Sequence, residues 1–140
     1  APTSARVIAE VTANLIAKLS TNTYEELLNR GGTFHCVCQG ETSWHAYALE
    51  IFRQARERGL SLAVQKVKPI PSSAYPVPAT RPLNSRMNCD KLKQEFQLVP
   101  PDWQTALWHV LEEYIRLEKI DQDLAGRSSL LSTKTEEHAA

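Results

Sequence analysis

The stretch that decides the fold reads Ala-Tyr-Pro-Val-Pro-Ala-Thr-Arg-Pro-Leu-Asn-Ser-Arg-Met and occupies residues 74–87. Proline fixes φ and removes a backbone donor, so the prolines of this stretch hold it extended without making it part of a sheet. Arg81 offers a planar fork of donors suited to phosphate or carboxylate, and Asn84 and Ser85 add both donors and acceptors. The pattern therefore predicts a stiff loop that faces a polar, anionic small molecule.

Helical patterns flank this loop on both sides. Apolar residues at helical spacing, together with capping residues, predict helices over residues 4–19, 23–29, 44–58 and 88–96, and a longer one that Asp102 caps. Thr42 or Ser43 is expected to cap the third helix. Trp44 and Trp103 each open a helix, and we expect both indoles to pack in the core.

Two strands are expected as well, at residues 33–38 and 60–67. In the first, Phe34, Cys36 and Cys38 alternate with His35 and would share one face. A sheet of two strands is marginal without further strands or a covering helix. Either the helices form a compact α+β lobe with these strands, or part of the apolar surface docks on a missing partner domain.

Composition limits the function classes. The chain has 140 residues, 42% of them hydrophobic, which fits one domain with a core. Basic and acidic residues number 16 each, so no net charge favours nucleic acid or an anionic membrane. No apolar run is long enough for a membrane helix, and the three cysteines are too few for a disulfide framework. These features predict a soluble, cytoplasmic protein.

Several short motifs, taken in order, resemble the C-terminal part of bacterial dTDP-4-dehydrorhamnose reductases. In the loop they are Tyr75-Pro76, Pro78-Ala79, Arg81-Pro82 and Asn84-Ser85-Arg86, followed by Lys91-Leu92 and Pro101-Asp102-Trp103. Upstream, Ala1-Pro2-Thr3, Gly32-Thr33-Phe34-His35 and Gly40-Glu41-Thr42-Ser43-Trp44 continue the likeness. The resemblance covers residues 1–117.

The resemblance implies an architecture. The fold class would be α/β or α+β: the C-terminal substrate-binding lobe of a Rossmann-type extended short-chain dehydrogenase/reductase, mostly helical with two or three short strands. Residues 1–120 would form that lobe, and the polar residues 121–140 a disordered tail. The N-terminal dinucleotide-binding domain would be absent from this chain, because no Gly-rich phosphate loop follows a strand.

The resemblance also implies an activity, of which this chain would supply only a part. The family reduces dTDP-4-dehydro-L-rhamnose to dTDP-L-rhamnose, a precursor of cell-surface polysaccharide. NADPH or NADH would bind the missing N-terminal Rossmann domain and not this chain. No Tyr-x-x-x-Lys pair is present to donate and tune a proton. We therefore expect no catalytic residues here and no reductase activity from the chain alone.

Binding residues are expected in the loop. By resemblance, Tyr75, Arg81, Asn84 and Ser85 would contact the nucleotide-sugar substrate, with Arg81 at a diphosphate or a structural carboxylate. The competing interpretation is that Arg81 and Asn84 only tie down the loop by hydrogen bonds to backbone. The sequence does not decide between them.

Other readings of the sequence fit it less well. His35-Cys36-Val37-Cys38 suggests zinc ligands, but alternation directs the histidine away from the cysteines, so no metal is predicted.

A homodimer is possible. A regulatory module similar to the regulatory subunit of methionine adenosyltransferase is the alternative function. A proline-rich interaction segment is disfavoured, because no Pro-x-x-Pro occurs.

Overall fold

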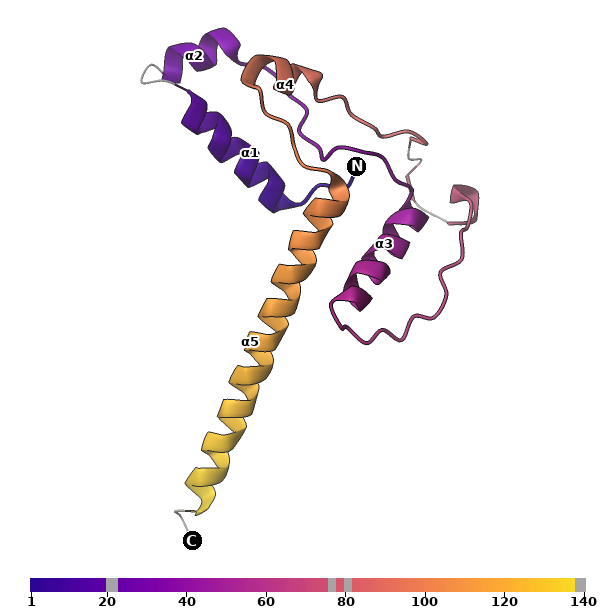
Figure 1. Ribbon diagram of the computed structural model, residues 1–140, viewed down its shortest axis with the longest axis vertical. Coiled ribbons are helices and arrows are strands. Elements are labelled where there is room, and N and C mark those ends of the chain that lie inside the picture. Colours follow the sequence, from indigo (N-terminus) through magenta and orange to yellow (C-terminus); the bar gives the residue numbers. More distant parts are fainter. Residues whose placement is uncertain (20–22, 76–77, 80–81, 138–140) are drawn as a thin grey trace. The chain divides into compact units, whose positions relative to one another are not determined.

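The computed structural model describes residues 1–19, 23–75, 78–79 and 82–137, with side chains up to residue 120 except those of residues 23, 26 and 27. Two compact units are present, Ala1–Leu107 and Trp108–Ala140. The helices of the described residues are labelled in Figure 1: α1 (Ala5–Lys18), α2 (Thr23–Arg30), α3 (Trp44–Glu57), α4 (Asp90–Phe96) and α5 (Trp103–Glu137). A 3₁₀ turn, η1 (Ser72–Ala74), lies between α3 and α4 in the sequence.

Three helices begin at side-chain caps. The Ser4 hydroxyl accepts from the amide three residues on at 3.4 Å, and the Ser43 hydroxyl does the same at 3.1 Å. The Asp102 carboxylate accepts from the amide two residues on, at 2.9 Å. Such caps satisfy backbone donors that have no partner within the helix. The predicted starts of α1, α3 and α5 are therefore confirmed, and Ser43, not Thr42, caps α3.

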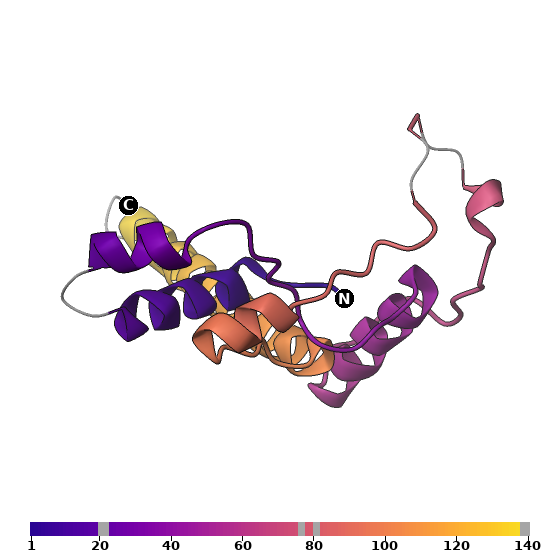
Figure 2. The ribbon, with the colours of Figure 1, turned by 90° about the horizontal axis from the view of Figure 1, so that it is seen from above.

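The core of the first unit lies between α1 and α4. Leu92, Phe96 and Leu98 are buried, and apolar side chains of α1 and of the segment after α2 pack against them: Val11, Leu15, Leu19, Phe34 and Cys36. The rings of Phe34 and Phe96 lie 5.2 Å apart, and the guanidinium of Arg30 lies 4.5 Å from the Phe96 ring. These contacts bring α1, α2 and α4 side by side, as both ribbon views show (Figures 1 and 2).

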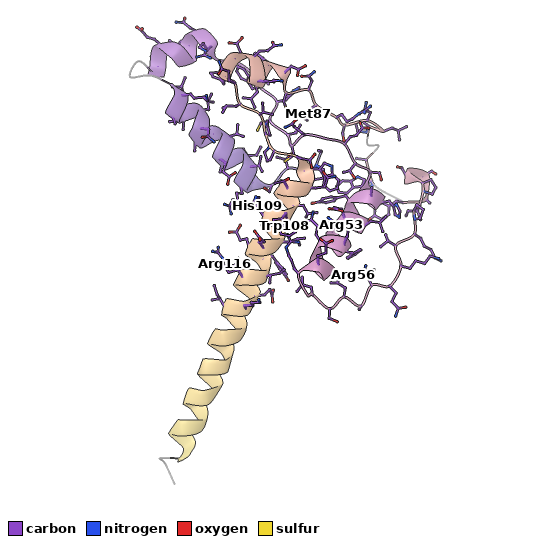
Figure 3. The ribbon with its side chains drawn as sticks, in the orientation of Figure 1. Arg53, Arg56, Met87, Trp108, His109 and Arg116 are labelled. Atoms are coloured by element: carbon purple, nitrogen blue, oxygen red, sulfur yellow. The ribbon has the colours of Figure 1, made fainter. Side chains whose placement is uncertain are left out.

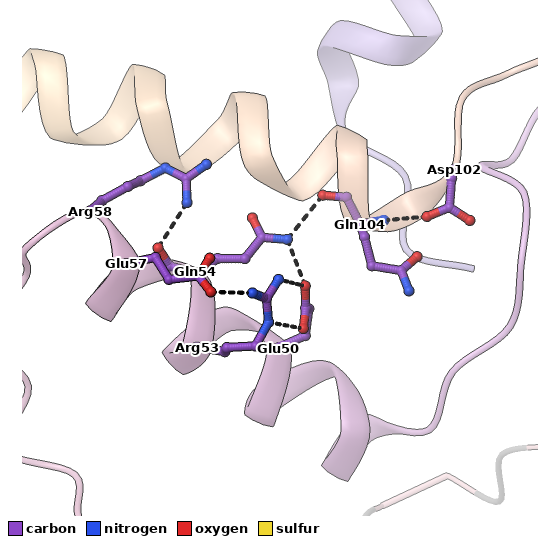
Figure 4. Close-up of polar contacts among 7 residues, drawn as sticks. All are labelled: Glu50, Arg53, Gln54, Glu57, Arg58, Asp102 and Gln104. Carbon is purple, nitrogen blue, oxygen red and sulfur yellow. Dashed lines mark hydrogen bonds and ion pairs between the residues drawn. The ribbon is translucent and has the colours of Figure 1, made fainter.

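A second contact joins α3 to the first turn of α5 (Figure 4). Trp103 is buried, and its indole lies edge-on to Tyr47 with ring centroids 5.7 Å apart. The Gln54 amide is only 2% exposed and donates to Glu50 Oε1 at 2.8 Å and to the Gln104 carbonyl at 3.1 Å. Buried polar groups need such partners, so this amide fixes how α3 meets the start of α5.

Glu50, which accepts a hydrogen bond from Gln54, is the charged residue beside this contact. Its carboxylate accepts two hydrogen bonds from the half-exposed Arg53, at 2.7 and 2.5 Å. The hydrogen bond from Arg53 lowers the pKa of Glu50 to about 2, with the Gln54 amide acting in the same direction. Glu50 is therefore ionised at every physiological pH.

The expected burial of Trp44 is wrong, while that of Trp103 is confirmed. The Trp44 side chain is 81% exposed and contacts Tyr47 edge-on, with centroids 6.4 Å apart. Trp44 occupies the first position of α3, where no neighbouring turn of the helix precedes it. The apolar pattern placed it on the buried stripe, but the packing against α5 begins one turn later, at Tyr47.

Neither expected strand forms a ladder within the described residues. For residues 33–38, side chains bind the backbone where a neighbouring strand would: Thr3 Oγ1 accepts from the Cys38 amide at 2.9 Å, and Lys91 Nζ donates to the Thr33 carbonyl at 3.2 Å. The single bridge pairs Gln39 with Asp102. The chain is mostly helical as predicted, but the two or three short strands are not found in the part that the structure describes.

Alternation along residues 33–38 nevertheless holds. Phe34 and Cys36 pack against the core cluster, Cys38 is buried, and His35 between them is exposed. An extended backbone places alternate side chains on opposite sides whether or not it pairs. The sequence thus predicted the local conformation correctly, and the missing feature is the neighbouring strand.

Residues 60–67 form no strand ladder in the part of the chain that the structure describes, and Ala63 lies at a bend. Arg56 on α3 donates to the Val64 carbonyl at 2.6 Å, and a ring nitrogen of His45 lies 3.4 Å from the Val67 carbonyl (Figure 3). These contacts hold the segment beside α3 without a ladder. After Val67 the chain leads to the helical turn η1 (Figure 2).

The second unit consists of the remainder of α5. Within it, His109 Nδ1 lies 3.7 Å from Glu112 Oε2, one turn on (Figure 3). The helix continues to Glu137, through the segment for which a disordered tail was expected. No proline follows Pro101, and Leu, Ala, Lys and Glu beyond residue 116 favour the helix, although Gly126 does not. No helix in the described residues is both long and apolar enough to cross a membrane.

Candidate functional site

The candidate site is the loop between η1 and α4. Tyr75 follows η1, its amide donates to the Ser72 carbonyl at 3.2 Å, and its side chain is 64% exposed. Asn84 and Ser85 are exposed on the returning part of the loop. Arg81 lies outside the described residues, so its predicted contact with phosphate or carboxylate stays a prediction.

Asn84 is held by its neighbour two residues on. Its Oδ1 accepts from both the backbone amide and Nε of Arg86, each at 3.1 Å. The interpretation that Asn84 binds the loop itself is therefore partly correct, because its carbonyl oxygen is engaged by backbone. The hydrogen bonds of the described residues do not join Tyr75 to Asn84 or Ser85.

Arg86 connects the loop to the turn before α3. Its Nη1 forms an ion pair with the Glu41 carboxylate, which lies 45 residues earlier in the chain. Sequence reasoning missed this contact. Opposite charge was the only signal available, and with 16 residues of each sign it does not select a pair.

The turn that carries Glu41 is fixed by backbone contacts. The Gln39 amide donates to the Pro101 carbonyl at 2.9 Å, and the Trp103 amide donates to the Gln39 carbonyl at 3.3 Å. Gly40 has φ +81°, and a Cβ there would lie 3.1 Å from both Asp102 Oδ2 and Trp103 Cδ1. This glycine therefore allows close packing against the start of α5.

An open groove of about 330 Å³ lies beside the end of the loop, lined by Val37, Cys38, Gln39, Gly40, Met87, Asn88, Cys89, Asp90, Lys93, Leu98, Val99 and Pro100. Several of its polar groups serve the fold. Asn88 exchanges hydrogen bonds with Asp90 at the start of α4, at 2.6 and 2.8 Å. The side-chain amide of Gln39 donates to the Pro100 carbonyl at 2.8 Å. The groove could accommodate part of a ligand, but these groups already have partners.

Two of the three cysteines have a raised pKa. Burial raises the pKa of the Cys36 thiol, and the neighbouring Cys89 and Cys38 raise it further. Burial also raises the pKa of Cys38, against a hydrogen bond with Thr3 that lowers it. The reactive species is the thiolate, so a raised pKa makes Cys36 and Cys38 less reactive at neutral pH than a free thiol. Among the described residues no three His, Cys, Asp or Glu side chains are grouped as metal ligands.

In carbonyl reduction, a tyrosine hydroxyl can donate a proton to the carbonyl oxygen. Such a group needs a lowered pKa and a nearby cation. The pKa of Tyr114 is instead raised, because its hydroxyl hydrogen bonds to the Glu118 carboxylate. Tyr75 has alanine, not lysine, four residues on.

Comparison with known proteins identifies the family. Residues 1–116 match the family described as the RmlD substrate binding domain. The chain belongs to this family. Proteins named dTDP-4-dehydrorhamnose reductase are similar to it: that of Shigella flexneri is 43% identical over 113 residues, which cover 81% of this chain and 36% of the relative. That of Escherichia coli is 42% identical over 112 residues, covering 80% and 36%.

A more distant relative has the same name and is covered over the same share of its own length. The dTDP-4-dehydrorhamnose reductase of Burkholderia thailandensis is 40% identical over 109 residues, covering 76% of this chain and 36% of the relative. The chain thus spans about a third of the length of these curated relatives. The resemblance on which the sequence prediction depended is confirmed as family membership, and its extent, 1–117, agrees with the matched residues 1–116.

Proposed function

We propose that this chain is the substrate-binding portion of a dTDP-4-dehydrorhamnose reductase and that it holds the nucleotide sugar with the loop around residues 75–85. The observation that carries the proposal is the match of residues 1–116 to a substrate-binding family whose similar proteins are named as this reductase. The chemistry of the loop supports it, since its amide, hydroxyl and phenol groups are exposed and the end of the loop, at Met87, lines an open groove.

In this function the chain binds and orients, and the reduction itself takes place elsewhere. Holding a substrate in a reactive geometry is a large part of enzymatic rate enhancement. Tyr75, Arg81, Asn84 and Ser85 are the proposed contacts. The hydride donor, NADPH or NADH, would supply two electrons to the keto carbon of the sugar.

The residues of this chain do not fit that cofactor. A dinucleotide pyrophosphate needs glycines whose backbone the phosphates can approach at the start of a helix. Gly40 is the glycine nearest the start of α3, but the space beside it is taken by Asp102 and Trp103. The cofactor would therefore bind a separate nucleotide-binding part of the kind that makes up the rest of the longer relatives.

Residues 33–38 and 60–67 support docking to such a part. The first segment has strand alternation, and neither has a strand partner among the described residues. Large apolar side chains are also exposed in the first unit, including Ile8, Ile16 and Leu49. A sheet edge and apolar surface are what a neighbouring domain covers. We propose that the nucleotide-binding part covers them.

Calorimetric titration of the 140-residue chain with dTDP-L-rhamnose tests the binding function, with GDP-mannose as the control nucleotide sugar. Binding of the first and not of the second is expected. Asn84→Ala should weaken it, whereas Asn14→Ala, an exposed asparagine on α1, should not. Equal affinity for the two nucleotide sugars, or no binding of either, would contradict the proposal.

A second assay tests whether this chain binds the substrate without reducing it. The chain alone should not oxidise NADPH in the presence of dTDP-4-dehydro-L-rhamnose. Adding the part of the Shigella flexneri relative that precedes its match to this chain should restore turnover. Activity of the chain by itself would refute the assignment of a binding role only.

A further inference from the structure

We infer that Arg86 is a positioning residue: it holds Asn84 so that the side chain presents its amide N–H groups, and not its carbonyl oxygen, to the bound ligand. This inference rests on the proposed binding function of the loop. It assigns to Arg86 a function distinct from that of a phosphate-binding arginine.

The hydrogen bonds of Asn84 determine which of its groups remains available. A side-chain carbonyl oxygen has two lone pairs, and the Arg86 backbone amide and Nε donate to Oδ1 at 3.1 Å each. Both acceptor positions are therefore used within the loop. The Nδ2 amide remains and can only donate, so Asn84 suits a ligand group that accepts, such as a phosphate, carbonyl or hydroxyl oxygen.

The guanidinium of Arg86 is occupied from two sides. Nε binds Asn84, and Nη1 forms the ion pair with Glu41. Its charge is thus balanced by a carboxylate before any ligand arrives. A lysine could keep the ion pair but has a single nitrogen, and could not form the planar fork that reaches both partners.

Glu41 supplies the fixed end of this contact. It follows Gly40 in the turn that backbone hydrogen bonds attach to the start of α5. Arg86 and Glu41 are 64% and 67% exposed, and exposed ion pairs contribute little to stability. The contact is therefore better suited to orienting the loop than to holding the fold together.

Nuclear magnetic resonance of the ¹⁵N-labelled 140-residue chain without ligand tests the geometry. Arg86→Lys should shift the Asn84 side-chain amide signals, and Glu41→Gln should shift them in the same direction. Arg6→Lys is the matched control, since Arg6 forms an exposed ion pair with Glu10 on α1. Unchanged Asn84 signals in Arg86→Lys would overturn the inference.

Titration with dTDP then separates positioning from direct contact. Asn84→Ala and Arg86→Lys should each weaken binding by about 3- to 10-fold, the effect of one hydrogen bond. If Arg86 acts through Asn84, the double variant Asn84→Ala/Arg86→Lys should bind no more weakly than Asn84→Ala alone. Losses that multiply would mean that Arg86 contacts the ligand itself, and would refute positioning.

The titration and the resonance measurement test the binding function and the role of Arg86 separately. If the unsubstituted chain does not bind dTDP, the proposed binding function falls. The resonance measurement still decides whether Arg86 orients Asn84. Near-ultraviolet circular dichroism should be the same for all variants, because exposed side chains are changed and the aromatic core is not.

Discussion

Replacing Gly40 by alanine should destabilise the first unit more than any replacement of the same kind elsewhere in it. Gly40 has φ +81°, a conformation that costs a residue with a Cβ about 1–2 kcal/mol. The added methyl would also lie 3.1 Å from Asp102 Oδ2 and 3.1 Å from Trp103 Cδ1. Trp103 is buried against Tyr47, so it has little room to move, and overpacking of this kind costs about 1–3 kcal/mol.

Gly59→Ala is the matched control. Gly59 has φ +80°, and a Cβ there would meet nothing within 4 Å. Its replacement carries the backbone cost alone, offset in part by about 0.4–1 kcal/mol from the restricted unfolded chain. We therefore expect Gly59→Ala to lose about 1 kcal/mol and Gly40→Ala about 2–4 kcal/mol.

Urea unfolding, followed by near-ultraviolet circular dichroism of the packed aromatic residues, measures both free energies of unfolding. The difference between the variants isolates the contact of the turn with the start of α5. Equal losses would refute the reasoning, because they would show that the space beside Gly40 is open. A loss below that of Gly59→Ala would refute it as well.

Three further results are expected. Arg53 lowers the pKa of Glu50 to about 2, so the contribution of Glu50 to stability is complete above about pH 4.5 and is lost as the pH falls toward 2. Between these two pH values, the urea midpoint should therefore drop less in Glu50→Gln than in the unsubstituted chain. Burial raises the pKa of Cys36 and Cys38, so both should be alkylated more slowly than free cysteine at pH 7.5 and faster as the pH rises, and mass spectrometry that finds the free rate would contradict this. Asp102→Ala should lower the free energy of unfolding by about 1 kcal/mol through loss of the cap of α5, and an unchanged urea midpoint would argue against capping.

The helices could be predicted from the sequence because their determinants are local. Ser4, Ser43 and Asp102 each cap the helix that follows, at the positions expected. Of the two tryptophans expected in the core, Trp103 is buried and Trp44 is exposed. Its exposure depends on where α3 meets α5, and a pattern along one helix does not contain that information.

The strands could not be verified from this chain because a strand is completed by its neighbour. Alternation correctly placed Phe34, Cys36 and Cys38 on one side, but the ladder requires a second segment at the right distance. In the first segment, Thr3 and Lys91 bind the backbone where a strand would have done so. Sequence indicates the tendency to extend, and the partner decides whether a sheet forms.

That the loop binds a ligand stays a prediction. Tyr75, Asn84 and Ser85 are exposed and therefore accessible to a ligand. The ion pair of Arg86 with Glu41 was not foreseen, because it joins residues that become neighbours only after folding.

The three tryptophans of this chain give it built-in optical probes. Trp44 is exposed at the start of α3, Trp103 is buried against Tyr47, and Trp108 belongs to the second unit. Indole emission shifts to longer wavelength in water, so the emission of the whole chain mixes three environments. A chain with Trp44→Phe and Trp108→Phe would emit from Trp103 alone and would report on the turn at Gly40, whereas one retaining only Trp44 would respond when another protein covers the start of α3.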